Sequence, residues 1–109
     1  MKLRSVCIGT ADAQRLAAFY STVLQEEPHA DGNHYSFSQI NIWNPSDVKT
    51  SGENSIWLVF SDTDIDALYE RLVKEIPDLK VISPPERKPW GVYAFWFSDP
   101  DGNRISAYG

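Results

Sequence analysis

Few side chains in this sequence could do chemistry, and their types and spacing match no common catalytic arrangement. The chain of 109 residues has two histidines, His29 and His34, and one cysteine, Cys7. The histidines flank an Asp-Gly-Asn turn, where exposed histidines are common, so we do not expect them to form a metal site. Cys7 lies in an apolar stretch, so we interpret it as a small core residue rather than a reactive thiol.

Nucleophilic catalysis has no support either. The sequence contains no G-x-S-x-G elbow and no phosphate-binding glycine loop. A serine nucleophile such as Ser5 or Ser106 would need a neighbouring base, and neither histidine has an evident route to one. Glu26, Glu27 and Glu53 are interpreted as solvated charges.

Composition excludes several classes of partner. Ten basic and fifteen acidic residues give a net charge of −5, and the basic pair Arg87-Lys88 stands beside Glu86. A protein that binds nucleic acid needs a basic face, so we expect no such partner. No apolar run approaches the roughly 18 residues of a membrane span, so we expect no membrane partner. The amino terminus does not resemble a secretory signal and the single cysteine allows no internal disulfide, so we expect a cytoplasmic protein.

The hydrophobic pattern predicts two halves with the same order of elements. Each half begins with a short apolar strand, continues into an amphipathic helix capped by Thr10 or Asp12 and by Asp62 or Asp64, and ends in further strands. Pro84-Pro85 with Pro89 predicts a connecting loop, and Asp99-Pro100-Asp101-Gly102 predicts a tight turn. The predicted strands and helix stripes are 6–8, Leu16 to Leu24, 35–37, 40–42, 56–60, Ile65 to Ile76, 79–82, 92–97 and 104–108.

The two halves also resemble each other in sequence. With an offset of 50, Ser5-Val6-Cys7-Ile8 aligns with Ser55-Ile56-Trp57-Leu58, and Asp12 aligns with Asp62. We therefore predict an α+β fold of two βαβββ modules in one domain, with module one at 1–44, a linker at 45–54 and module two at 55–109. A single ferredoxin-like βαββαβ sandwich is the alternative.

Three segments resemble the glyoxalase/bleomycin-resistance/dioxygenase group, also called the vicinal oxygen chelate superfamily. They are Ala13 to Leu24 with its Ala18-Phe19-Tyr20, Ser55 to Leu72, and Trp90 through Asp99-Pro100-Asp101-Gly102-Asn103-Arg104-Ile105. The resemblance covers nearly the whole chain. It implies paired βαβββ modules whose curved sheets enclose a cavity, frequent homodimers, and in many members a divalent metal held by His, Gln or Glu.

The resemblance also implies where metal ligands would stand. They fall at Ser5, at Ser55, at Ser106 and near Asn41 or Ile42. A neutral hydroxyl is a poor ligand for zinc, and harder ions need several carboxylates or carbonyls. We therefore expect no metal and no other cofactor.

A cavity remains as the candidate site. Alternation along the strands places Ser5, Cys7, Ser55, Trp57, Ser106 and Tyr108 on the face that the family turns inward. Rings could stack on a planar ligand while hydroxyls orient it, although ordinary core packing explains the aromatic residues about as well. The predicted pocket residues are Ser5, Cys7, Trp43, Ser55, Trp57, Trp90, Tyr93, Phe95, Ser106 and Tyr108.

The leading hypothesis is a metal-free homodimer that binds a small aromatic or cationic molecule, in the manner of antibiotic-sequestering relatives. The first alternative is a metal-dependent lyase or dioxygenase with unusual ligands such as His34 or Glu53. The second is an interaction domain whose cavity is filled by its own side chains.

Overall fold

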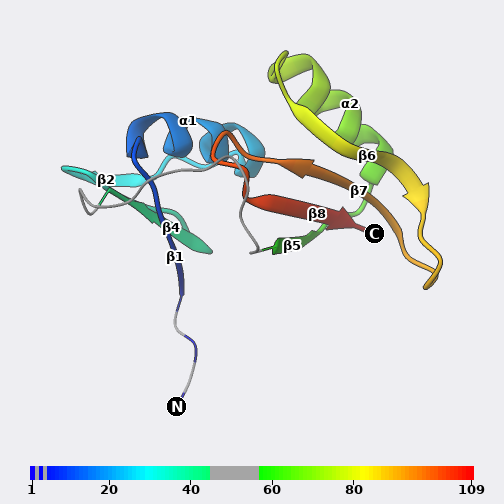
Figure 1. Ribbon diagram of the computed structural model, residues 1–109, viewed down its shortest axis with the longest axis horizontal. Coiled ribbons are helices and arrows are strands. Elements are labelled where there is room, and N and C mark those ends of the chain that lie inside the picture. The colour runs from blue at the N-terminus through cyan, green and yellow to red at the C-terminus, as the bar shows by residue number, and fades with distance from the viewer. Residues whose placement is uncertain (2, 4, 45–56) are drawn as a thin grey trace. The chain divides into compact units, whose positions relative to one another are not determined.

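The computed structural model describes residues 1, 3, 5–44 and 57–109, and the chain divides into two compact units, Met1–Ser51 and Gly52–Gly109. Each unit contains one βαβββ module, as predicted, and each module has its own four-stranded mixed sheet (Figure 1). The predicted linker 45–54 lies outside the described residues. The elements are β1 Val6–Gly9, α1 Ala13–Leu24, β2 His29–Asp31, β3 His34–Ser36, β4 Ile40–Trp43, β5 Trp57–Ser61, α2 Ile65–Glu75, β6 Lys80–Arg87, β7 Tyr93–Ser98 and β8 Arg104–Tyr108.

Module one has the strand order β1-β4-β3-β2, with β1 and β4 parallel. The Asp12 carboxylate accepts the Arg15 backbone N–H at 3.1 Å and so caps α1, whose Leu16 and Tyr20 are fully buried. Ile8 and Ile42 are buried in this core, whereas Cys7, directly before Ile8 on β1, is exposed. The prediction that Cys7 belongs to the core is therefore wrong, because neighbouring strand residues point to opposite faces.

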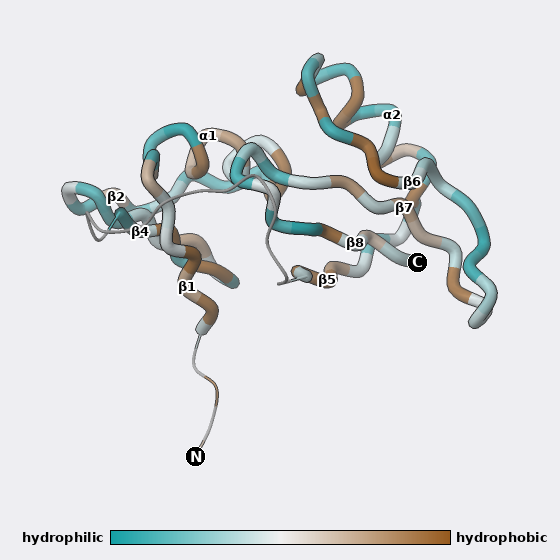
Figure 2. Tube along the Cα trace, viewed as in Figure 1, coloured by the Kyte–Doolittle hydropathy of each residue, from teal (hydrophilic) through white to brown (hydrophobic). Residues whose placement is uncertain are grey.

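Module two has the equivalent order β5-β8-β7-β6, with β5 and β8 parallel. The Asp64 carboxylate caps α2 by accepting the Ala67 N–H at 3.0 Å. Both hydrophobic and hydrophilic residues occur along α2 (Figure 2), and its buried Ile65 and Leu72 are seven residues apart, on one side of the helix. We call the side of the sheet that packs on α2 the helix face. There the ring of Tyr69 meets the ring of Phe95 edge-on at 5.3 Å.

The predicted Asp-Pro-Asp-Gly turn connects β7 to β8. The Gly102 N–H donates to the Asp99 carbonyl at 3.0 Å, and Gly102 has a φ of 85°, which favours glycine. The buried Asp99 carboxylate accepts the backbone N–H groups of Asp101 and Asn103, each at 2.9 Å. These bonds fix how β7 and β8 pair, and therefore which residues share a face.

Strand β6 corrects the loop predicted at Pro84-Pro85. Both prolines lie inside the strand Lys80–Arg87. Proline removes a backbone donor, and it is tolerated here because β6 is the edge strand and its pairing with β7 is interrupted by register shifts between Val81 and Glu86. The loop prediction fails because it rests on the general rule that proline ends a strand.

The structure also corrects the offset between the modules from 50 to 52. The Thr10 N–H donates to the Trp43 carbonyl and the Asp62 N–H to the Tyr108 carbonyl, both at 3.0 Å. The helix caps Asp12 and Asp64 then follow at the same spacing. With this offset, Trp57 is the module-two equivalent of Ser5. Ser106 is the equivalent of Asn41, because Ser106 pairs with Val59 as Asn41 pairs with Cys7.

Among the described residues, no helix is both long enough and apolar enough to cross a lipid bilayer.

Candidate ligand pocket

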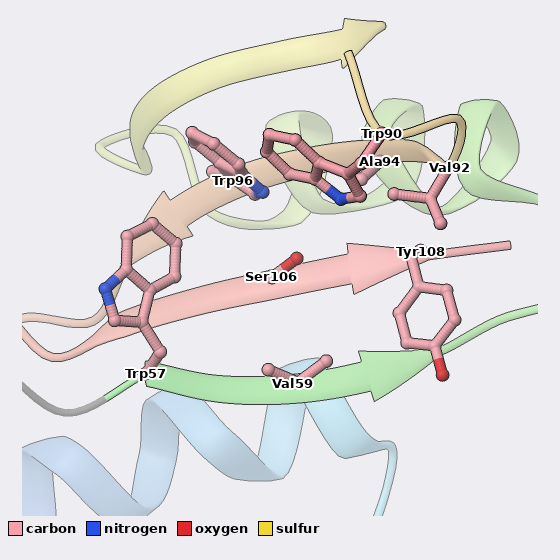
Figure 3. Close-up of a pocket in the computed structure, with 8 residues that line it drawn as sticks. All are labelled: Trp57, Val59, Trp90, Val92, Ala94, Trp96, Ser106 and Tyr108. Atoms are coloured by element: carbon pink, nitrogen blue, oxygen red, sulfur yellow. The ribbon is translucent and has the colours of Figure 1, made fainter. Parts of the chain in front are cut away.

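A pocket of about 570 Å³ lies on the side of the module-two sheet away from the helix face, which we call the open face. Its side chains come from three strands and from the turn before β7 (Figure 3). Ser106 lies near the centre of this face, with Trp57 on one side and Tyr108 on the other. The lining residues are Trp57, Val59, Trp90, Val92, Ala94, Trp96, Ser106 and Tyr108.

The strand register explains why these side chains gather. Residues directly opposite on paired strands point to the same face, as do residues two positions apart. Ser106 is opposite Val59 on one side and Trp96 on the other. Tyr108 is opposite Ala94 in the next row along the sheet. Ser106 therefore lies between larger side chains from both neighbouring strands.

Trp96 is the centre of an aromatic cluster within the pocket. Its ring meets Trp57 edge-on, with centroids 5.2 Å apart, and stacks with Trp90 at 6.1 Å and 18°. Trp90 is 65% exposed and Trp57 is 37% exposed. Much of this indole surface therefore faces outward rather than filling a core, which favours the pocket interpretation over ordinary core packing.

A lysine side chain also packs on the ring of Trp96. The Lys88 amino group lies 3.7 Å from the centroid of its ring and donates to Ser83 at 2.7 Å and to Glu86 at 2.8 Å. Lys88 is only 4% exposed. The hydrogen bond from Lys88, followed by that from Ser83, holds the pKa of Glu86 below its usual value of 4.5. These contacts hold the edge of the pocket in one arrangement through hydrogen bonds, an ion pair and a cation–π contact.

A tight turn positions Trp90. The Lys88 N–H donates to the Val92 carbonyl at 2.7 Å, and the Gly91 N–H donates to the Lys88 carbonyl at 2.9 Å. The Arg87 guanidinium donates to the Gly91 carbonyl at 2.6 Å. Gly91 has a φ of 105°, a conformation that residues with a side chain rarely adopt.

Four of the ten predicted pocket residues line this pocket: Trp57, Trp90, Ser106 and Tyr108. Tyr93 and Phe95 do not. Phe95 is fully buried on the helix face, and the Tyr93 hydroxyl donates to Asp66 of α2 at 2.5 Å. The prediction missed Val59, Val92, Ala94 and Trp96.

The remaining predicted residues lie elsewhere in the chain. Ser55 is outside the described residues. Ser5, Cys7 and Trp43 belong to module one, where Cys7 is opposite Asn41 in the parallel pair. Asn41 donates to the Ser5 hydroxyl oxygen at 3.2 Å. In module two, Ser106 corresponds to Asn41 and Trp57 corresponds to Ser5, and both of these module-two residues line the pocket.

The family model of the Glyoxalase/Bleomycin resistance protein/Dioxygenase superfamily matches residues 2–107. The chain belongs to this superfamily. No curated protein matches the chain.

Solved structures show the same fold. A protein of unknown function from Agrobacterium tumefaciens is 26% identical, with a TM-score of 0.82 over 99% of this chain and 93% of that chain. A superfamily member from Sphaerobacter thermophilus is 24% identical, with a TM-score of 0.69 over 98% and 97%. A lactoylglutathione lyase from Agrobacterium tumefaciens is 18% identical, with a TM-score of 0.70 over 98% and 92%.

The side chains at the superfamily's metal positions do not fit a divalent metal. The positions that the resemblance implies are Ser5 and Asn41 in module one, and their equivalents in the paired strands of module two are Trp57 and Ser106. Trp57 replaces Ser55 as the equivalent of Ser5. Hydroxyl and amide oxygens carry no charge, and an indole has no acceptor atom. Zinc prefers imidazole, thiolate or carboxylate, and Ca²⁺ needs several oxygen ligands that include carboxylates. Within 1, 3, 5–44 and 57–109, no group of three or more His, Cys, Asp or Glu residues could hold a metal ion.

Proposed function

We propose that this superfamily member binds a small planar aromatic molecule in the open-face pocket of module two and needs no metal to do so. The observation that carries the proposal is the cluster of Trp57, Trp90 and Trp96, whose indole rings border a pocket of about 570 Å³. A pocket of this size matches the range that encloses small ligands.

The chemistry of the lining supports binding rather than bond cleavage. The rings provide apolar stacking surface, and the hydroxyls of Ser106 and Tyr108 provide one or two hydrogen bonds that would orient a ligand. The eight lining residues include no carboxylate, imidazole or thiol, so the pocket holds no strong general base and no activated nucleophile.

A neutral planar probe, naphthalene-2-carboxamide, tests the proposal by isothermal titration calorimetry. We expect saturable binding with one site per chain. Trp90→Leu should weaken the affinity roughly twofold to tenfold, because an aromatic pair contributes about 0.5–1.5 kcal/mol beyond area burial. Trp90 is highly exposed, so this variant should fold.

Ile82→Ala is the matched control. Ile82 is exposed and apolar like Trp90 and lies on β6 of the module-two sheet, but it does not line the pocket, so its removal should leave the affinity unchanged. Equal losses in the two variants, or no binding to the parent protein, would contradict the proposal. Binding that appears only when a divalent metal is added would favour the alternative of a metal-dependent enzyme.

The proposal includes a homodimer and a cytoplasmic location. The family resemblance supports the dimer, because it implies frequent homodimers. The sedimentation coefficient is expected to correspond to twice the mass of one chain. A free, exposed Cys7 is compatible with a reducing compartment.

A further inference from the structure

Two cations lie against the tryptophans of an otherwise uncharged pocket. The amino group of Lys88 is 3.7 Å from the centroid of Trp96, and the guanidinium carbon of Arg104 is 5.4 Å from the centroid of Trp57. Neither residue lines the pocket itself. Both cations therefore lie at its border.

The two cations differ in how their charges are balanced. Lys88 is buried, and its charge is paired with Glu86 at 2.8 Å. Arg104 is exposed, and the structure gives it no carboxylate partner in the ranges 1, 3, 5–44 and 57–109. The Trp57 end of the pocket therefore carries an uncompensated positive charge.

The register places Arg104 on the same face as the pocket. Arg104 is two residues before Ser106 on β8, so both side chains point to the open face. It is also directly opposite Trp57 on β5 and Ser98 on β7. The guanidinium therefore lies beside Trp57 at the margin of the pocket, on the same face as the lining residues.

Building on the proposed function, we propose that the ligand is a planar aromatic anion, such as an aromatic carboxylate, whose ring occupies the tryptophan cluster and whose charged group is bound by Arg104. The guanidinium presents several N–H donors in a fixed plane that matches a carboxylate. A cationic ligand would be repelled by Arg104, and would find the ring of Trp96 already in contact with Lys88. The local charge therefore opposes the cationic ligand that the sequence hypothesis allowed.

Three naphthalene probes of equal ring size test this inference by calorimetry at low ionic strength. They are naphthalene-2-carboxylate, naphthalene-2-carboxamide and 2-naphthylmethylammonium. We expect the carboxylate to bind most tightly and the ammonium most weakly. The carboxylate should bind roughly threefold to tenfold more tightly than the carboxamide, as an exposed or partly desolvated ion pair would give. This ratio should fall as salt is added.

Three variants test whether Arg104 causes the preference for the carboxylate probe. Arg104→Gln should bring the ratio of carboxylate to carboxamide affinity close to one, and Arg104→Lys should retain part of it. Lys74→Gln removes the same charge from the exposed side of α2, away from the open face, and should keep the parent ratio. A ratio that is unchanged in Arg104→Gln, or equally reduced in Lys74→Gln, would overturn the role of Arg104.

The outcomes separate the two proposals. If none of the three probes binds, the proposed function fails. If all three bind with similar affinity, or the ammonium binds most tightly, the proposed pocket stands and the anionic ligand is wrong.

Discussion

At the scale of single residues, the pocket depends on a lysine that is buried beside a tryptophan. A buried ammonium is costly unless its charge is paired and its donors are used. Lys88 meets both conditions through Glu86 and Ser83, and its amino group faces the ring of Trp96. The position of Trp96 therefore depends on polar contacts at the edge strand as well as on ring packing.

This arrangement predicts a lowered pKa for the Glu86 carboxyl group. Hydrogen bonds from Lys88 and Ser83, together with the lysine charge, hold the pKa of Glu86 below its usual value of 4.5. Because the folded-state pKa is lowered, the stabilisation is present above about pH 4.5 and is lost as the pH falls through the folded-state pKa. Carboxyl NMR titration should show the shift directly. Lys88→Met should return the pKa toward its usual value, and Lys74→Met should leave it lowered. A Glu86 pKa at or above the usual value in the parent protein would contradict this contact.

At the scale of elements, β7 shows what the sequence could and could not predict. The run from Val92 to Phe97 predicts a strand, but its residues are all apolar or aromatic, so no alternation indicates which of them face the helix. In the structure, residues equidistant from Asp101 pair with each other, which places Trp96 opposite Ser106. Counting outward from the four residues of the Asp-Pro-Asp-Gly motif would instead place Phe95 opposite Ser106. The extra residue in the turn, Asn103, decides which face Trp96 takes, and the motif alone does not reveal it.

The other face of β7 is joined to α2 by one polar contact that responds to pH. The hydrogen bond from the Tyr93 hydroxyl to Asp66 raises the pKa of Tyr93 above its usual value of 10.0, and burial and the Asp66 charge act in the same direction. Because the folded-state pKa is raised, the stabilisation is fully present below about pH 10 and is lost as the pH rises through the folded-state pKa.

Urea unfolding of Tyr93→Phe measures this contact. The parent protein should be more stable than the variant at neutral pH, and the difference should shrink once the pH exceeds the usual tyrosine pKa of about 10. Tyr69→Phe is the control. Its hydroxyl has no hydrogen bond among the residues that the structure describes, so its effect should not vary with pH in this way. If the difference in unfolding free energy between the parent protein and Tyr93→Phe stays constant from neutral pH to above about pH 10, the contact does not form.

At the scale of the whole molecule, the repeated module could be predicted because each half repeats the same order of strand, helix and strands. The number of residues that separates equivalent positions of the two modules is harder to predict. Ser5 aligns with Ser55 by residue type, whereas the hydrogen bonds at the strand ends align it with Trp57. The strand through Pro84-Pro85 could not be foreseen, because the tolerance for proline comes from the place of β6 at the sheet edge. Strand order is a tertiary property that local sequence does not encode.

The two modules share one fold but have chemically different side chains at equivalent positions. At equivalent positions, module one has Ser5 and Asn41 joined by a hydrogen bond, whereas module two has Trp57 and Ser106 in an aromatic pocket. Neither pair provides the charged or imidazole ligands of a metal site. The central claim is therefore that module two binds a planar aromatic molecule through its tryptophans without a metal.

Indole N–H signals in a proton–nitrogen NMR spectrum test this claim most directly. The chain has four tryptophans, and single substitutions assign each signal. We predict that adding naphthalene-2-carboxamide to protein treated with a chelator shifts the signals of Trp57, Trp90 and Trp96, saturates at one probe per chain, and gives the same curve after Zn²⁺ or Mg²⁺ is added. Signals that do not move, or that move only after the metal is added, would contradict it.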